Sequence, residues 1–266
     1  MLFTYKPIDH PLHRLQEYID YLFLEVWCKA ADAEYDITLF DGCFELKEII
    51  NDFSNLETKA AKFFNGNIQK IYKLFTQLDQ AEIDQLKIWY HANNKIDALC
   101  SLVADYQPIR YNELIDWNAD IGNAFKAFFP KMYDADFLTS APIKNRLGDM
   151  SEHYRDFVKL NDEGKCPYCG IADIEGGYSS KREAYDHFLP KGIYPFNSIN
   201  FYNLAPMCHK CNCSYKLSKD PLLDNQGAPR RAFYSYSIEK PDITICIELK
   251  NKDIDSLTPD NVDLNS

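Results

Sequence analysis

Two short stretches, Cys166-Pro-Tyr-Cys169 and Cys208-His-Lys-Cys211, decide the fold of the C-terminal part of this 266-residue chain. A Cys-x-x-Cys pair places two thiolates on one tight turn, so that both can bind a single Zn²⁺ ion. Two such pairs separated by a few dozen residues complete a closed four-thiolate site. The spacing therefore predicts a structural zinc ion held by Cys166, Cys169, Cys208 and Cys211.

The remaining cysteines show no paired spacing. With nine cysteines in total and no apolar secretory segment at the N-terminus, the sequence favours a reduced, cytoplasmic protein over a disulfide scaffold. Cys213 is interpreted as an idle thiol, because four thiolates already satisfy Zn²⁺. The other unpaired cysteines are Cys28, Cys43, Cys100 and Cys246.

The segment between the two cysteine pairs carries a second set of candidate ligands. Asp186 and His187 are adjacent, Asn203 follows, and Asn212 comes directly after the fourth cysteine, with Lys216 one helical turn beyond. Carboxylate and amide oxygens suit a hard divalent cation such as Mg²⁺, and a neutral imidazole suits proton transfer near pH 7. These residue types indicate a hydrolytic site beside a structural zinc site.

This order of residues resembles the HNH endonucleases, also called ββα-metal or His-Me finger nucleases. In that family an Asp-His pair ends one strand, an Asn lies in the hairpin, and an Asn or His opens the next helix. The resemblance covers residues 166–216 and includes the zinc-bracketed variant of the motif. The runs His187-Phe-Leu-Pro-Lys-Gly192 and Asn203-Leu-Ala-Pro-Met-Cys208 also resemble HNH nucleases of bacterial anti-phage defence.

The resemblance implies a role for each candidate residue. His187 would activate the attacking water, and Asp186 and Asn212 would bind one Mg²⁺ or Mn²⁺ ion. Asn203 would tie the hairpin backbone so that the histidine faces the scissile phosphate. Lys216 shares a helical face with Asn212 and would contact a phosphate oxygen, although a solvated surface lysine is an equally good interpretation.

The implied activity is metal-dependent hydrolysis of phosphodiester bonds, with DNA favoured over RNA and with 5′-phosphate and 3′-hydroxyl products. The alternative is a zinc-stapled nucleic-acid- or protein-binding module without catalysis. His209 lies inside the second cysteine pair, where the zinc ligand set is already full. It is therefore interpreted as a bystander or a DNA-facing residue.

The charge of the chain is unevenly distributed. The net charge is −11, yet residues 181–231 hold 8 Lys and Arg against 4 Asp and Glu, whereas residues 1–160 hold 17 against 25. An acidic body weakens binding to duplex DNA, so we expect another subunit or a protein partner to help deliver the substrate. Residues 1–160 are interpreted either as a scaffold that shapes the substrate groove or as the surface that binds such a partner. The basic residues of the 181–231 island are Lys181, Arg182, Lys191, Lys210, Lys216, Lys219, Arg230 and Arg231.

The sequence predicts an α+β protein with a helical domain over residues 1–160 and a zinc-braced nuclease domain over 161–266. The polar, turn-prone Asn161–Gly164 marks the boundary. Apolar stripes at helical spacing predict helices opened by Pro11, over residues 64–78 and from residue 83 to Asn93-Asn94. Further helices are expected over residues 113–129 and 140–158.

After the motif, residues 232–238 and 242–249 are rich in β-branched and aromatic side chains. They predict a hairpin, which the polar tail Thr258–Ser266 follows. No run approaches the ~18 apolar residues of a membrane span, so we expect a soluble protein with no membrane partner.

Overall fold

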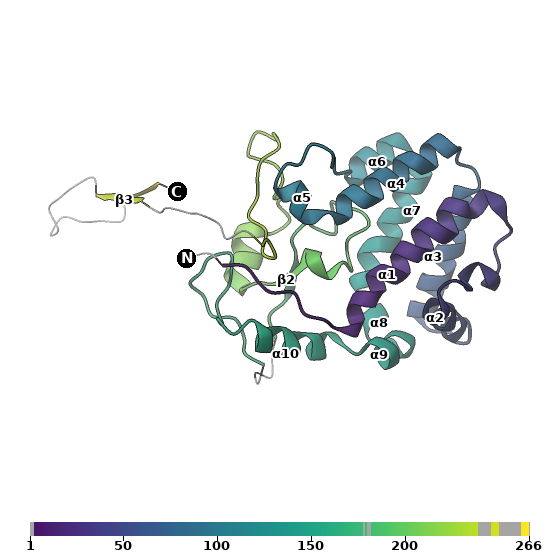
Figure 1. Cartoon of the computed structure of the whole chain (residues 1–266), viewed down its shortest axis with the longest axis horizontal. Helices are drawn as coiled ribbons and strands as arrows, with labels where there is room; N and C mark the ends of the chain where they lie inside the picture. The colour runs from purple at the N-terminus through teal and green to yellow at the C-terminus, as the bar shows by residue number, and fades with distance from the viewer. Residues whose placement is uncertain (1–2, 178, 180–181, 239–245, 250–261, 266) are drawn as a thin grey trace.

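The computed structural model of the chain describes residues 3–177, 179, 182–238, 246–249 and 262–265. In these residues the chain is mainly helical, with two small antiparallel sheets, in agreement with the predicted α+β class (Figure 1). The α-helices are α1 (Arg14–Tyr21), α2 (Phe44–Ser54), α3 (Lys59–Phe75), α4 (Gln80–Asn94), α5 (Ile96–Cys100), α6 (Tyr111–Trp117), α7 (Ala119–Phe128), α8 (Ala135–Leu138), α9 (Ala141–Leu147) and α10 (Met150–Leu160). The 3-10 segments are η1 (Pro11–His13), η3 (Trp27–Asp32), η4 (Ile37–Phe40), η5 (Phe129–Tyr133) and η6 (Phe201–Asn203), and the π-helical segments are η2 (Leu22–Val26) and η7 (Cys211–Lys216). The strands are β1 (Tyr185–His187), β2 (Leu204–Pro206), β3 (Cys246–Leu249) and β4 (Val262–Asn265).

The helices predicted from the first three apolar stripes are confirmed. The first stripe forms the helical run η1–α1–η2–η3, which begins at Pro11 where the His10 side chain accepts a hydrogen bond from the Leu12 amide. The second stripe lies on α3. The third lies on α4, whose N-terminus has a capping box made by Asp79 and Glu82. Because the stripes face inward, their apolar side chains form the core.

Two of the predicted long helices are each divided in two. The helix expected over 113–129 is interrupted at Asn118, whose extended backbone lets its side chain accept a hydrogen bond from the Ile121 amide and start α7. The helix expected over 140–158 stops at Gly148, which has a φ of +78°, and restarts with Asp149 as N-cap of α10. Apolar periodicity continued through both breaks, so it concealed them.

Aromatic rings dominate the helical core. Phe23 stacks on Tyr90 with ring centroids 4.1 Å apart, which joins α4 to the first helical run. Trp27 is fully buried and contacts rings from α3 and α7. Its indole N–H donates to the Ile68 carbonyl at 3.2 Å, so the polar atom of this large side chain is satisfied.

The core continues across the predicted boundary at residue 160. Phe196 belongs to the loop between β1 and β2, yet its ring is fully buried among helical aromatics, 5.5 Å from Phe23 and 5.2 Å from Phe129. Its φ is +81°, an unfavourable backbone conformation for a bulky residue. Burial of the ring offsets that strain, and the loop is thereby attached to the helical body.

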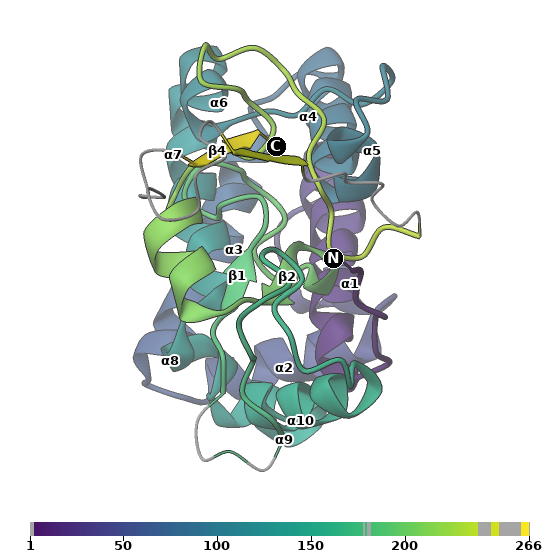
Figure 2. The ribbon, with the colours of Figure 1, turned by 90° about the vertical axis from the view of Figure 1, so that its left-hand side faces the viewer.

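The two sheets are short. β1 pairs with β2 in antiparallel register, with Asp186 opposite Ala205 and His187 opposite Leu204, and η7 follows in the order strand, strand, helix (Figure 2).

The predicted C-terminal hairpin is wrong in its pairing. Residues 232–238, all of them described, contain no strand. The Tyr234 ring instead packs against Phe188 and the Tyr236 ring against Phe157, and both hydroxyls donate to backbone carbonyls. β3 pairs with β4, while residues 239–245 and most of the predicted tail lie outside the described residues.

No helix among the described residues is both long and apolar enough to cross a membrane. The expected cytoplasmic location stays a prediction.

We predict that Phe196→Ala lowers the free energy of unfolding by about 3–5 kcal/mol, because it removes a fully buried ring and leaves a cavity. Urea unfolding followed by circular dichroism measures this change. Phe44→Ala is the matched control, because the Phe44 side chain is 72% exposed and should change stability by less than about 0.5 kcal/mol. Equal losses in both variants would contradict the anchoring role of Phe196.

Candidate functional site

The four cysteines predicted from spacing are brought together in space. Their Sγ atoms all lie within 4.8 Å of one another, and Cys169 and Cys208 are 4.0 Å apart. A tetrahedral Zn²⁺ ion with Zn–S bonds of about 2.3 Å separates its thiolates by about 3.8 Å, so the arrangement fits. Cys166, Cys208 and Cys211 are buried and Cys169 is partly exposed. This four-cysteine cluster can therefore hold a metal ion such as zinc.

Backbone geometry prepares the first cysteine pair for a metal. The Cys166 amide donates to the Ala172 carbonyl, and the Gly170 amide donates to the Cys166 carbonyl, each at 2.8 Å. Burial alone would raise the pKa of the Cys169 thiol, but hydrogen bonds from the Ala172 and Ile171 amides lower it to about 7. A thiolate stabilised in this way is ready to bind a cation.

Strand β1 places Asp186 opposite the end of η7. The Asp186 carboxylate is buried, and the Lys216 Nζ lies 3.1 Å from its Oδ1 and 2.9 Å from its Oδ2. The same ammonium donates to the His187 carbonyl at 2.7 Å. Lys216 is thus not a solvated surface lysine, and its predicted contact with a phosphate oxygen stays a prediction. It is the counter-charge of Asp186.

One oxygen of Asp186 remains incompletely satisfied. Oδ2 is inaccessible to solvent and accepts no well-directed hydrogen bond from the described residues, although the Lys216 ammonium is close to it. Burial raises the pKa of Asp186 above its usual value, and Lys216 opposes this by favouring the carboxylate. A buried carboxylate oxygen of this kind is a suitable ligand for a hard cation.

His187 is held in one orientation by the 188–203 loop. Its Nε2 lies 2.9 Å from the Ser198 carbonyl oxygen, and the Tyr133 ring packs edge-on against the imidazole at 4.5 Å. A carbonyl can only accept, so Nε2 carries the proton and Nδ1 keeps its lone pair. Burial lowers the pKa of His187 to about 3, so the ring is neutral at pH 7.

Asn203 connects the two ends of that loop. The side chain is fully buried, and its Oδ1 accepts from the Leu189 amide at 2.8 Å while its Nδ2 donates to the Leu189 carbonyl at 3.0 Å. A further bond runs from Nδ2 to the Asn197 carbonyl at 3.2 Å. These contacts are the backbone ties implied by the resemblance, and their effect on His187 stays a prediction.

Asn212 is not brought onto Asp186 by any described hydrogen bond. It lies in the first turn of η7, where its amide donates to the Cys208 carbonyl, and its side chain is partly exposed. Cys213 and His209 are exposed and lie outside the four-cysteine cluster. Of the predicted basic island, Lys181 lies outside the described residues.

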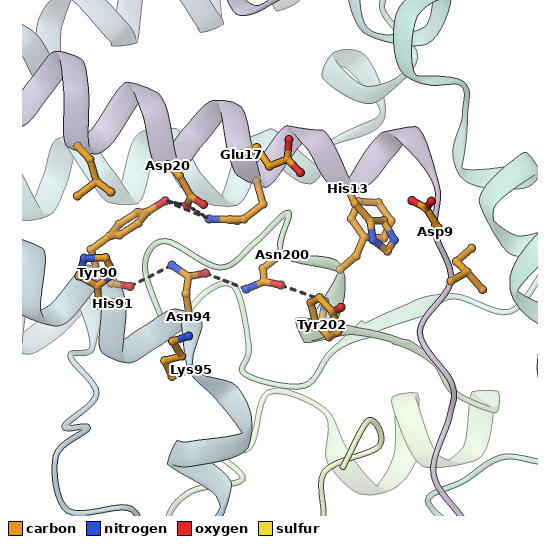
Figure 3. A pocket seen from close by; sticks show the side chains of 14 residues that line it. Asp9, His13, Glu17, Asp20, Tyr90, His91, Asn94, Lys95, Asn200 and Tyr202 are labelled. Atoms are coloured by element: carbon orange, nitrogen blue, oxygen red, sulfur yellow. Dashed lines mark hydrogen bonds between the residues drawn. The ribbon is translucent and has the colours of Figure 1, made fainter. Parts of the chain in front are cut away.

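A cavity that no sequence pattern predicted lies between α1, α4 and residues 200–202 and has a volume of about 540 Å³ (Figure 3). Its lining is polar and partly acidic. Asp20 accepts hydrogen bonds from the Tyr90 hydroxyl and from Gln16, and the Asn200 side chain donates to Asn94 at 2.9 Å. The other labelled residues are Asp9, His13, Glu17, His91, Lys95 and Tyr202. These residues come from separate segments, so no local spacing reveals the cavity.

A pair of histidines, the half-buried His13 and the buried His153, connects this cavity to β1. His13 Nε2 and His153 Nε2 are 3.0 Å apart, and His153 Nδ1 lies 2.5 Å from the hydroxyl of Tyr185. Burial lowers the pKa of His13 to about 4 and that of His153 to about 2, and in each case a neighbouring histidine adds to the effect. These rings are therefore neutral in the folded protein.

Comparison with known proteins finds partial similarity. "Protein ea31" of Escherichia phage lambda is 31% identical over 96 residues, which cover 36% of this chain and 28% of the phage protein. "Septu protein PtuB" of Bacillus thuringiensis is 32% identical over 77 residues, which cover 26% of this chain and 29% of that protein. The chain thus spans less than a third of the length of either relative. No family model and no solved structure matches it.

We expect Cys166→Ser to abolish zinc binding and to unfold the segment around the four-cysteine cluster, because structural zinc contributes folding free energy directly. Metal content by mass spectrometry and thermal unfolding by circular dichroism test this. Cys213→Ser is the control, since that thiol is exposed and outside the cluster. Full zinc content and an unchanged Tm in the Cys166 variant would remove the four-thiolate assignment.

The buried histidines predict that stability falls with acid. Because their folded pKa values lie below the ordinary value of about 6.5, the unfolded chain binds protons that the folded chain does not. Above pH 6.5 these rings are neutral in both states and leave stability unchanged. As pH falls from 6.5 towards the folded pKa values of about 2 to 3, the fold loses about 1.4 kcal/mol per pH unit for each buried ring.

Urea unfolding at pH 7.0 and 5.5 measures this loss. His153→Gln should reduce the loss of stability by the part that comes from one histidine taking up a proton on unfolding. His209→Gln, at an exposed position, should leave the loss unchanged. Identical pH dependence in wild type and His153→Gln would show that His153 is not a neutral buried ring.

Proposed function

We propose that the chain is an HNH-type endonuclease that hydrolyses phosphodiester bonds with one divalent cation. The observation that carries this proposal is the arrangement on β1, where a neutral, oriented imidazole follows a buried carboxylate in the strand. The strand, strand, helix order of β1, β2 and η7, bracketed by the four-cysteine cluster, supports the same interpretation.

His187 is proposed as the general base. Its Nε2–H is committed to the Ser198 carbonyl, which leaves Nδ1 as the lone pair that accepts a proton from the attacking water. The lowered pKa keeps the ring unprotonated at all physiological pH values. Asn203 acts as a positioning residue, because it ties together the loop that supplies the Ser198 carbonyl.

Asp186 and Asn212 are proposed to hold the catalytic Mg²⁺ or Mn²⁺. The incompletely satisfied Oδ2 of Asp186 and the amide oxygen of Asn212 have the donor chemistry that such ions prefer. When bound, the cation supplies positive charge against the phosphoryl oxygens. Lys216, released from Asp186, would then be free to contact a phosphate oxygen.

The biological setting is proposed to be anti-phage defence. The partial similarity to Septu protein PtuB supports it, together with the resemblance of the His187–Gly192 and Asn203–Cys208 runs to defence nucleases. DNA is the proposed substrate, with 5′-phosphate and 3′-hydroxyl products. The acidic helical body is the proposed surface for a protein partner.

A binding module without catalysis is the second candidate. The Asp186–Lys216 ion pair favours it, because Lys216 already neutralises the Asp186 carboxylate. An ion pair with a purely structural role would have the same geometry. The two candidates differ in whether purified protein cuts nucleic acid.

We predict that the zinc-loaded chain nicks supercoiled plasmid in the presence of Mg²⁺ or Mn²⁺ but not in EDTA. His187→Ala should slow nicking by about 10²–10⁴-fold, the range that a positioned general base contributes. His209→Ala is the matched control, because this exposed histidine lies in the same zinc-bracketed segment. Equal nicking by both variants, or none by wild type, would leave the binding module as the better candidate.

A further inference from the structure

A second cavity, of about 680 Å³, lies beside the four-cysteine cluster, between that cluster, η7 and the 217–233 segment. We refer to it as the basic cavity. Its volume falls within the range of about 300–1,000 Å³ that is typical of ligand sites. A cavity of this size can hold a few nucleotide units but not a duplex. The residues that carry the argument are Tyr168, Tyr215, Lys219, Arg230, Arg231 and Phe233.

The charge of this cavity is opposite to that of the chain. Four cationic side chains line it, and none of its lining residues is Asp or Glu. Lys219, Arg230 and Arg231 form no ion pair with any described residue, whereas Arg110, Arg146 and many other cations of the protein are paired. Arg230 is held in place by a bond from its Nε to the Pro221 carbonyl at 3.0 Å. Unpaired cations in an acidic chain are available to phosphates.

Aromatic rings lie among these cations. Tyr215 is 57% exposed, and Phe233 packs edge-on against Tyr168 with centroids 5.7 Å apart. Exposed rings beside a basic groove are the features by which proteins bind single-stranded nucleic acid, since every base has a face that can stack. The acidic cavity between α1 and α4 has Asp9 and Glu17 in its lining and lacks this combination.

The basic cavity adjoins the proposed catalytic residues through one side chain that lines it. Lys216 lines the cavity and at the same time contacts Asp186 and the His187 carbonyl. A strand seated in the cavity would therefore have its backbone directed to β1.

We propose that the basic cavity binds an unpaired stretch of nucleic acid, with Arg230 and Arg231 on its phosphates and Tyr215 stacked on a base. This rests on the proposed function for the nature of the ligand, and it makes single-stranded or locally opened substrate the preferred one.

The test is a binding measurement that does not depend on catalysis. Fluorescence anisotropy in EDTA follows the binding of zinc-loaded full-length protein to a labelled twelve-nucleotide oligo(dT) and to a blunt duplex of equal length. The single strand should bind at least tenfold more tightly. Arg230→Gln combined with Arg231→Gln should weaken that binding at least tenfold. The slope of log K against log salt concentration should become shallower by about 1.4, because each lost phosphate contact on a single strand accounts for about 0.7 of that slope.

Matched controls separate the cavity from general charge and ring effects. Lys70→Gln combined with Lys73→Gln removes the same charge from an exposed part of α3, and Phe44→Ala removes an exposed ring elsewhere. Both should bind like wild type, whereas Tyr215→Ala should bind at least fivefold more weakly. Circular dichroism melting curves verify that each variant is folded.

Equal affinity for single strand and duplex, wild-type affinity in the Arg230 and Arg231 variant, or no binding to either probe would each overturn this inference. The nuclease proposal fails separately. If the protein binds the single strand through these residues yet never cuts with Mg²⁺ or Mn²⁺, the binding inference stands and the nuclease proposal fails. If the variant without Arg230 and Arg231 cuts duplex normally, the nuclease proposal stands and the binding inference fails.

Discussion

The seating of the 188–203 loop in the helical body is the constraint on which the candidate site depends. Phe196 inserts its ring among helical aromatics, and the buried Asn93 side chain of α4 bonds the Pro195 carbonyl and both backbone groups of Ile109. The Asn197 side chain returns a bond to the Asn93 carbonyl at 3.0 Å. With the loop fixed in this way, the Ser198 carbonyl sits where it determines the tautomer of His187.

The four-cysteine cluster constrains the same small sheet from its other end. β2 leads through Met207 into Cys208, and Cys211 begins η7, whose last residue is Lys216. The cluster therefore fixes the start of the helical segment that carries Asn212 and Lys216. Two unlike devices, an aromatic core and a sulfur cluster, hold the short strand β1 between them. A three-residue strand pair has little stability of its own, so both devices are needed.

The sequence was most informative where chemistry depends on local spacing. Two cysteine pairs predicted the sulfur cluster, and apolar stripes at helical spacing predicted the first helices. Local spacing was uninformative where tertiary contacts decide, as at Phe196, where burial outweighs an unfavourable φ. The breaks at Asn118 and Gly148 were missed because apolar periodicity continued through them, although the sequence carries an N-cap residue type at Asn118 and a helix-ending Gly148 followed by Asp149.

The candidate site shows the same division. Asp186, His187 and Asn203 were chosen as candidates from the motif, and their roles stay predictions. The pairing of Lys216 with Asp186 was not predicted, since residues 30 apart meet only through the folding of β2 and η7. A hairpin of residues 232–238 with 242–249 was predicted from β-propensity, yet the Tyr234 ring packs against Phe188 and the Tyr236 ring against Phe157 of α10. The β-branched and aromatic residues of this segment therefore indicated burial of their side chains rather than strand pairing.

The ammonium of Lys216 gives Asp186 a counterion that belongs to the chain itself. A buried carboxylate left alone would impose a desolvation cost on the fold, and proteins that rely on a dissolved metal to neutralise such a group lose stability when the metal is withdrawn. Here neutralisation is intramolecular, and it lasts as long as η7 remains attached at Cys211. The charge of Asp186 is thus balanced from within the chain, so this carboxylate requires no dissolved cation to remain buried in the fold.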